Sequence, residues 1–385
     1  MLQKLNAFLN RPTRVDRVIT GCMLTFVMTV LALGIGLMVA VGGWGNLVRT
    51  AKFAEILAVV EHIYIGEADG EEVADAGFQA MVAALNDRWS YYMDAEAYKQ
   101  YQERSANLYT GIGVTLQATE DGSLEVSAVE ADSPAETAGM TVGLTLKALN
   151  GVPVKGKTVQ ELSGEIRAIE GEFTLSAVDG QGKEHTFTLA VAQVFSDPIE
   201  YKMLDGEIGY IRIKNFDDGC ADGARAALEA LTDQGARALI FDVRSNGGGY
   251  VSELTSLLDT LLPEGEIFVS VDDKGKEKVT ESDANCVELP MAVLVNAGSY
   301  SAAEYFAAVL REYDVAAVVG EATTGKGRSQ INVPLLDGSA VHVSSKRYLT
   351  PARVDLSETG GIVPDVALEL GENDAQLAAA MELFS

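Results

Sequence analysis

The chain has 385 residues, 48% of them hydrophobic and 22% charged, a balance that allows two or three folded domains and excludes a wholly disordered protein. Its 29 Lys and Arg residues against 56 Asp and Glu residues give a net charge of −27. Such a surface repels phosphate, so nucleic acid is not an expected partner. Three Cys and three His leave little material for a zinc site, and we expect no metal or other cofactor.

The N-terminal region predicts a membrane anchor. No charged residue occurs from Val18 to Gly45, and crossing a bilayer takes about 20 apolar residues. The charged residues that precede this stretch are mostly basic: Lys4, Arg11, Arg14, Asp16 and Arg17. Because basic residues stay on the cytoplasmic side, we expect residues 1–17 to be a cytoplasmic tail and residues 18–43 to span the lipid bilayer. The protein would then be a single-pass protein of the cell membrane with its remaining part extracytoplasmic.

Two points about export stay open at this stage. Ala40-Val41-Gly42 could serve as a small-residue cleavage site, so a cleaved signal peptide is the alternative to an anchor. Outside the cytoplasm a disulfide is allowed, and Cys220 and Cys286 could form one or remain as two free thiols.

Four regions of different character follow the anchor. Residues 46–107 place apolar residues at intervals of three and four, which predicts helices around a turn at Asp87–Asp94. Residues 108–193 contain short alternating strands and two helices, which predicts a compact α+β module. Residues 194–370 alternate strands with helices, which predicts a layered α/β core with a largely parallel sheet. Residues 371–385 end in a short amphipathic helix.

One candidate for catalysis follows the predicted buried strand MAVLVN. Small residues in Asn296–Glu304 allow a tight turn from this strand into a helix. Ser301 is then expected at the helix N-terminus, where free backbone N–H groups can stabilise an oxyanion. A serine at that position can also be a simple N-cap, so this segment alone leaves both interpretations open.

A second candidate is the glycine-rich segment GEATTGKG at residues 320–327. It nearly matches a phosphate-binding loop, but Gly327 stands where that loop needs Ser or Thr. The strand-like residues that follow also replace the required helix. Lys326 could instead be a general base, because burial favours the neutral amine, which can activate a serine. A solvated loop lysine is the alternative.

These segments together resemble the carboxyl-terminal processing peptidases, a family of membrane-associated serine proteases with a Ser–Lys dyad. The family pattern G-S-x-S-A-x-E fits residues 298–304, its G-K-G lysine fits Lys326, 25 residues after Ser301, and Gln330 follows four residues later. Further matching segments, in chain order, are YTGIGV (109–114), SPA (133–135), NG (150–151), DVRSNGGG (242–249) and GIVPD (361–365). Their order and spacing extend the resemblance from about residue 48 to the C-terminus.

The resemblance implies a layered α/β protease core and a role for each matching residue. It implies Ser301 as the nucleophile, Lys326 as the general base and Gln330 as the residue that orients the lysine. It implies an oxyanion hole made by the backbone N–H groups of Gly248 and Ala302. A Gly-Gly-Gly turn after a buried strand also lets backbone approach a substrate carbonyl.

The resemblance further implies an inserted PDZ-like domain at residues 108–193. Gly111, Ile112 and Gly113 would present N–H groups to the terminal carboxylate of a substrate, whose tail would add as a strand to the sheet. Ile112 and Val114 would line a pocket for its last side chain. The alternative is that these residues are the core of a small β module.

Three residues depart from the family pattern beside the predicted site. Tyr300 stands where the family has a small residue, Gly247 stands where it has the proline of N-P-G-G, and Thr324 stands where an aromatic often precedes G-K-G. None of these changes removes a catalytic atom, so they bear on substrate preference more than on activity.

The sequence therefore predicts a membrane-anchored extracytoplasmic serine endopeptidase that cleaves proteins near their C-termini. Its expected partners are proteins or peptides with free C-termini, and two copies could pair through helices around residues 50–65 and 374–384. One rival is a non-catalytic anchored PDZ scaffold that binds peptide tails. Another is an acyl-CoA enzyme on a related sheet, which the export segment argues against.

Overall fold

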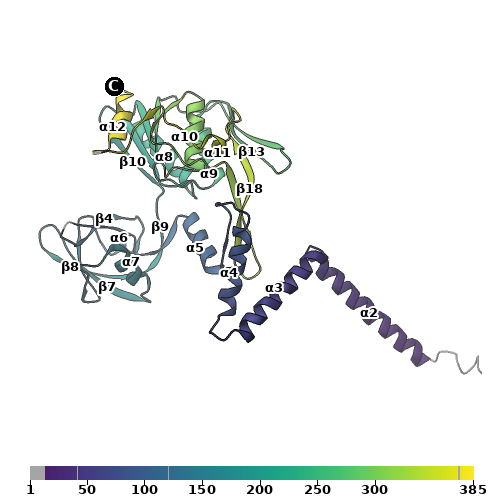
Figure 1. Ribbon diagram of the computed structural model, residues 1–385. Coiled ribbons are helices and arrows are strands. Elements are labelled where there is room, and N and C mark those ends of the chain that lie inside the picture. The colour runs from purple at the N-terminus through teal and green to yellow at the C-terminus, as the bar shows by residue number, and fades with distance from the viewer. Residues whose placement is uncertain (1–13, 41, 120, 372) are drawn as a thin grey trace, which may run out of the picture. The chain divides into compact units, whose positions relative to one another are not determined.

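The computed structural model of the chain describes residues 14–40, 42–119, 121–371 and 373–385. The chain divides after Ala84 into a helical unit and a larger unit of strands and helices (Figure 1). Residues 85–107 of the region predicted to be helical belong to the larger unit.

The described part of the first unit is helical. Its elements are α2 (Arg14–Ala40), α3 (Trp44–Ile63) and α4 (Gly70–Ala83). Asp69 caps α4 by accepting hydrogen bonds from the backbone N–H groups of Glu71 and Glu72, as a side-chain oxygen at an N-cap does. The rings of Phe53 and Phe78 stack at 5.2 Å and join α3 to α4.

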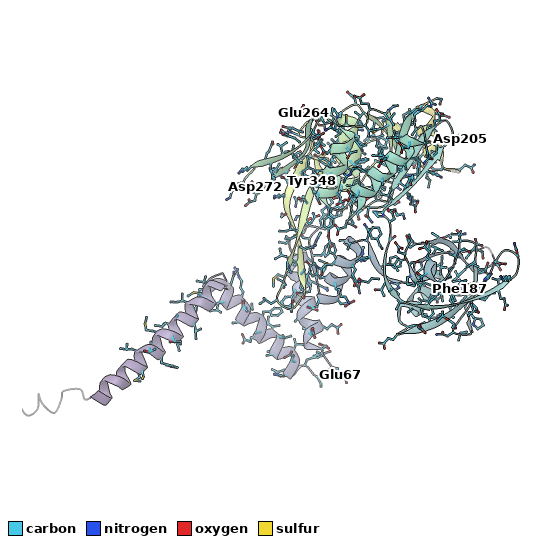
Figure 2. All side chains as sticks on the ribbon, turned by 180° about the vertical axis from the view of Figure 1, so that it is seen from behind. Glu67, Phe187, Asp205, Glu264, Asp272 and Tyr348 are labelled. Atoms are coloured by element: carbon cyan, nitrogen blue, oxygen red, sulfur yellow. The ribbon has the colours of Figure 1, made fainter. Side chains whose placement is uncertain are left out.

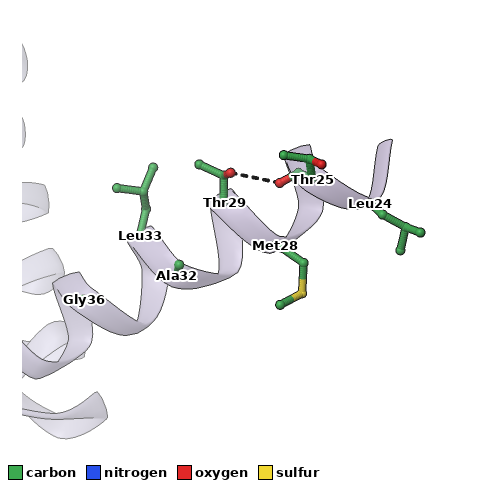
Figure 3. A pocket seen from close by; sticks show the side chains of 7 residues that line it. All are labelled: Leu24, Thr25, Met28, Thr29, Ala32, Leu33 and Gly36. Atoms are coloured by element: carbon green, nitrogen blue, oxygen red, sulfur yellow. Dashed lines mark hydrogen bonds between the residues drawn. The ribbon is translucent and has the colours of Figure 1, made fainter. Parts of the chain in front are cut away.

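Residues 18–40 of the segment predicted as a membrane anchor lie in α2. Figure 3 shows Leu24 and Leu33 projecting from this helix, and Thr29 Oγ1 donates to the carbonyl of Thr25 at 2.9 Å. In the part of the chain that the structure describes, no helix is both long enough and apolar enough to cross a membrane. Residues 1–13 of the predicted cytoplasmic tail lie outside the described residues.

A small α+β module occupies residues 108–195 of the second unit. Its sheet has the order β3-β4-β5-β7-β8, with β6 on β5, and β2 pairs separately with β9. The elements are β2 (Leu108–Gly111), β3 (Val114–Ala118), β4 (Leu124–Val129), α6 (Pro134–Thr137), β5 (Thr145–Leu149), β6 (Val152–Pro153), α7 (Val159–Arg167), β7 (Glu172–Val178), β8 (Glu184–Ala190) and β9 (Ala192–Phe195). Ser133 caps α6, and Asn150 and Gly151 have the positive φ angles that a tight Asn-Gly turn requires. The side chains of Leu162 and Ile166 on α7 are buried in the core of the module.

The main sheet is six-stranded with the order β10-β11-β12-β15-β16-β19. Its strands are β10 (Ile199–Leu204), β11 (Ile208–Ile213), β12 (Ala238–Asp242), β15 (Met291–Val295), β16 (Ala316–Gly320) and β19 (Val366–Ala367). β10 is antiparallel to β11, and the remaining pairs are parallel. The predicted layered α/β fold with a largely parallel sheet is therefore confirmed.

Helices cover both faces of the main sheet (Figure 1). One face packs on α8 (Cys220–Asp233), α9 (Val251–Leu261) and α10 (Ala302–Glu312). The other face packs on α12 (Ala375–Glu382). Every residue of β12 and of β15 is buried, because a strand covered on both sides has no solvent face. These are the strands that lead into the candidate catalytic loops.

A second sheet in this unit is antiparallel, which the sequence analysis did not predict. It has the order β1-β18-β13-β14, with β17 also on β18. Its strands are β1 (Tyr91–Met93), β13 (Gly265–Val271), β14 (Glu277–Ser282), β17 (Arg328–Pro334) and β18 (Ala340–Leu349), and a short helix α11 (Leu356–Thr359) follows. The predicted turn at 87–94 thus contains a strand, which pairs with β18 more than 240 residues further along the chain.

Two other features of this unit bear on the predictions. Cys220 is buried, Cys286 is partly buried, and both are free thiols.

Arg244, after β12, forms two hydrogen bonds of 2.7 and 2.8 Å to the carboxylate of Asp374 and also pairs with Asp242. The helix α12 that follows Asp374 is therefore tied to the loop that carries the predicted oxyanion residue. Near the N-terminal end of this unit, the helix α5 (Ala95–Ser105) lies in the chain between β1 and β2.

Candidate active site

The candidate catalytic residues follow three neighbouring parallel strands. The loop with Gly248 follows β12, Ser301 follows β15 and Lys326 follows β16, and these strands are adjacent in the sheet. Because parallel strands end at the same edge, the three loops meet there. They line one pocket of about 820 Å³, together with Ala302 and Gln330.

Ser301 has the backbone geometry of a sharp turn. Its φ and ψ angles are 59° and −123°, a strained region for a residue with a side chain. It immediately precedes α10, and its N–H donates to Glu304 Oε1 at 3.0 Å. The turn before it is fixed by Asn296, whose Oδ1 accepts from the N–H groups of Ser245 and Gly298. The serine therefore lies at a helix N-terminus, at the end of the loop after β15.

Lys326 is almost completely buried, with 9% of its surface exposed. Burial lowers the pKa of its amine to about 8, against opposing effects of the carboxylates of Glu304 and Asp87, while Arg88 lowers it further. The Lys326 Nζ lies 4.5 Å from the ring centroid of Trp89. A substantial fraction of this lysine is thus neutral near pH 8, the form that can accept a proton.

Glu304 connects the nucleophile to the lysine loop. It is fully buried, and its Oε1 accepts from the N–H groups of Ser301 at 3.0 Å and Lys326 at 2.6 Å. Its Oε2 accepts from Thr323 Oγ1 and from the N–H of Gly325, each at 2.8 Å. All four partners are donors, so both carboxylate oxygens accept hydrogen bonds from the serine and lysine loops. The sequence analysis included Glu304 in a motif without giving it a role.

Tyr348 is a second residue of the site that the sequence analysis missed (Figure 2). It lies on β18, is 3% exposed, and its hydroxyl donates to the carbonyl of Lys326. Burial raises its pKa well above the usual range, and a hydrogen bond with the Ser301 side chain opposes this shift. A phenol has one proton to donate, so the Ser301 hydroxyl is the donor in that second hydrogen bond.

Gly248 brings its backbone against the nucleophile. Its φ is +91°, and a β-carbon there would lie 2.7 Å from Ser301 Cβ and 2.9 Å from Ala302 N. Only glycine fits such an approach. The N–H of Gly248 donates to Asn246 Oδ1 at 2.8 Å. Ala302 is the first residue of α10, so its N–H has no acceptor within the helix.

Gln330 lines the same pocket but has other partners. Its Nε2 donates to the carbonyl of Arg328 and to Ser344 Oγ, each at 3.0 Å. Its role in orienting Lys326 stays a prediction. His342 on β18 also lines the pocket. Burial lowers the pKa of His342 to about 4, and the charge of Lys326 adds to this effect.

The residues predicted to bind a substrate tail lie in the small module. Ile112 is 3% exposed and belongs to the core of the module, so its side chain is not free to line a pocket. Gly111 pairs with Ala192, and Gly113 packs against Ser133, since a β-carbon there would lie 2.1 Å from Ser133 Cβ. Val114 begins β3, which is one of the two edge strands of the sheet. The described residues include no group of three or more His, Cys, Asp or Glu side chains that could hold a metal ion.

Comparisons with known proteins point to one family. The sequence profile of peptidase family S41 matches residues 207–368. The carboxy-terminal processing protease CtpA of Bacillus subtilis is 31% identical over 331 residues, covering 83% of this chain and 70% of the relative. The chloroplastic C-terminal processing peptidase of Tetradesmus obliquus is 29% identical over 75% of this chain and 66% of its own length.

The fold comparison agrees with these relatives. The solved structure of a photosystem II D1 C-terminal processing protease superposes with a TM-score of 0.50 at 24% identity, covering 86% of this chain and 96% of that one. The chain spans about two thirds of the length of the curated relatives it matches, from 64% to 70%.

Proposed function

Because the chain belongs to peptidase family S41, with the carboxy-terminal processing proteases among its relatives, we propose that it is a serine endopeptidase that cleaves proteins near their C-termini. The observation that carries this proposal is the pocket where a strained serine at a helix N-terminus and a buried lysine of lowered pKa come together. A scaffold that only binds peptides would need neither feature.

The proposed reaction begins when Ser301 Oγ attacks a substrate carbonyl and neutral Lys326 takes the hydroxyl proton. For this step the Ser301 hydroxyl turns from Tyr348 toward the amine. The resulting ammonium then gives its proton to the leaving amine, which leaves an acyl-enzyme on Ser301. Water then attacks the ester while Lys326 accepts one of its protons, and the lysine passes this proton to Ser301 Oγ as the C–O bond breaks, which releases the substrate's new carboxyl group and regenerates the serine and the neutral lysine.

The oxyanion of each tetrahedral intermediate would be held by the N–H groups of Gly248 and Ala302. Ala302 is suited to this because of its place at the start of α10. The Gly248 N–H donates to Asn246 Oδ1, so it must turn from that acceptor when substrate binds. Gln330 would orient the amine of Lys326 from its position on the pocket wall.

The small module is proposed to act as a PDZ-like domain that recognises or gates substrate tails. Its support is the unpaired edge of β3, beside which α7 lies, since PDZ domains bind a peptide by adding it as a strand to a sheet edge. Gly111 and Gly113, on either side of buried Ile112, would present backbone N–H groups to the terminal carboxylate. The side-chain pocket would then involve Val114 rather than Ile112.

The protein is proposed to be anchored in the cell membrane with its peptidase part outside the cytoplasm. The support is the uncharged stretch Val18–Gly45 and the basic residues before it. Pairing of two copies would involve α3, in which no residue is buried. This proposal is independent of the catalytic one.

Cleavage of unstructured peptides by the purified full chain tests the proposed activity. Ser301→Ala and Lys326→Ala should each reduce kcat/KM by at least about a thousandfold, as loss of a catalytic group does, while thermal unfolding still shows a folded protein. A chelator should leave the rate unchanged. Full activity of either variant would refute the dyad, and labelling of Ser301 by a fluorophosphonate would exclude the non-catalytic scaffold.

A further inference from the structure

An aromatic side chain from a distant part of the chain covers the amine of Lys326. The Trp89 ring centroid lies 4.5 Å from Lys326 Nζ and 4.2 Å from the Arg88 guanidinium carbon. The ring also lies beside Tyr300, with 5.5 Å between the two centroids and an interplanar angle of 32°. Trp89 thus contacts the lysine and the residue next to the nucleophile at once.

Hydrogen bonds hold the turn that carries Trp89. The carboxylate of Asp87 accepts from the N–H of Trp89 at 3.2 Å and from Ser90 Oγ at 2.7 Å. Ser90 Oγ in turn accepts from the N–H of Ser344 on β18 at 3.0 Å. Strand β1 then pairs with β18 directly after the turn. The position of Trp89 is therefore set by the antiparallel sheet.

We propose that Trp89 is a positioning residue for catalysis, whose indole shields the Lys326 amine from water and keeps it in the dry environment that a neutral lysine needs. The inference rests on the proposed function of Lys326 as the general base. It assigns a task to the segment at residues 87–93, which the catalytic mechanism does not otherwise use.

Other charged and titratable groups near the Lys326 amine also affect whether it is charged or neutral. The carboxylates of Glu304 on α10 and Asp87 in the turn favour its charged form, and Arg88 disfavours it. His342 on β18 lies close enough for the lysine charge to affect its own titration. The indole has two opposing effects, because its face attracts an ammonium ion while its bulk excludes water and favours the neutral amine. The proposal is that exclusion of water is the larger effect.

The pH dependence of kcat/KM for the full chain distinguishes these effects. Trp89→Ala should move the acidic limb to higher pH by about one unit, which lowers kcat/KM about tenfold at pH values below the midpoint, with a plateau at high pH close to that of the wild type. Trp89→Phe keeps an apolar ring and should shift the limb by less than half as much. Equal shifts in both variants, no shift in the alanine variant, or a shift to lower pH would each overturn the proposal.

A fluorescence titration keeps the proposal testable if the alanine variant does not fold or the chain proves inactive. The chain has two Trp residues, so Trp44→Phe leaves Trp89 as the sole indole. Its emission should change with a midpoint near pH 8, and Lys326→Met should abolish that transition. A transition unaffected by Lys326→Met, or one near the ordinary lysine value of 10.5, would contradict the shielding. An inactive chain that still shows the transition at pH 8 would refute the proposed peptidase function but not the shielding.

Discussion

The Tyr300 hydroxyl occupies the space that a side chain on Gly247 would need. A β-carbon on Gly247 would lie 2.6 Å from the Tyr300 hydroxyl oxygen and 2.9 Å from its Cζ. Both residues depart from the family pattern, and in the structure they lie against each other. The missing side chain in the oxyanion loop makes room for the ring that precedes the nucleophile.

This contact predicts that substitutions at the two positions are coupled. Gly247→Ala should lower kcat/KM and destabilise the fold by about 1–3 kcal/mol, as overpacking does, because Tyr300 must move against Trp89. Adding Tyr300→Ala should recover part of both losses. A double-mutant cycle on kcat/KM and on the free energy of unfolding measures the coupling, and strictly additive effects would show that the contact has no energetic weight.

Glu304→Gln should impair folding and activity together. The carboxylate accepts hydrogen bonds on both oxygens, and an amide offers only one oxygen. Its NH₂ group would face donors at a fully buried position, so we expect a loss of about 2–3 kcal/mol in the free energy of unfolding and at least about a tenfold loss in kcat. Denaturant unfolding measures the change in stability, and peptide cleavage measures the change in kcat. Glu229→Gln, on the exposed face of α8, is the matched control and should change neither.

Lys326 should make the protein less stable below pH 8 than above it. Its pKa is about 8 in the folded chain and 10.5 ordinarily. Between these values the unfolded chain binds more protons, so stability rises with pH across this window. Below pH 8 the lysine is protonated in both states, and its cost is constant at about 3 kcal/mol.

Lys326→Met should therefore abolish activity while increasing the free energy of unfolding at pH 7, and it should flatten the rise in stability between pH 8 and 10.5. Urea unfolding at several pH values measures this. Lys278→Met, at an exposed position, is the control and should have little effect. Lower stability of Lys326→Met at pH 7 would show that burial of this amine is not the dominant effect.

Gly248→Ala should eliminate activity through a local clash. The new β-carbon would meet Ser301 and the N–H of Ala302, so both the nucleophile and an oxyanion donor would move. We expect a loss in kcat of about 100- to 1000-fold, as for loss of an oxyanion donor. Gly235→Ala is the control, because Gly235 has a similar φ of +88° but open space around it. Equal losses of activity in the two variants would show that backbone strain alone is responsible.

The local sequence predicted the parts of the site that depend on single strands and loops. Ser301 and Lys326 each follow a buried apolar strand. A short run of apolar residues followed by a glycine-containing loop is a pattern that the sequence shows directly. Adjacent parallel strands then bring their carboxyl ends together, so the convergence of the two loops follows from fold class.

The rest depends on contacts between distant segments, which no local pattern encodes. Trp89 reaches Lys326 because β1 pairs with β18, and a strand of three residues is too short to show a period. Tyr348 was missed for the same reason, because it lies on β18 of the antiparallel sheet while its partner Ser301 follows β15 of the main sheet. Glu304 has the sequence signature of a capping residue, and its second set of partners, in the lysine loop, is visible only in the structure.

The most direct test of the Ser–Lys dyad is mass spectrometry of the acyl-enzyme formed with an activated ester substrate across the pH range. If Lys326 is the general base, an adduct should form on the peptide that contains Ser301, faster as the pH rises through about 8, and Lys326→Met should form no adduct at a comparable rate. An adduct that forms at an equal, pH-independent rate in Lys326→Met, or an adduct on another residue, would contradict it.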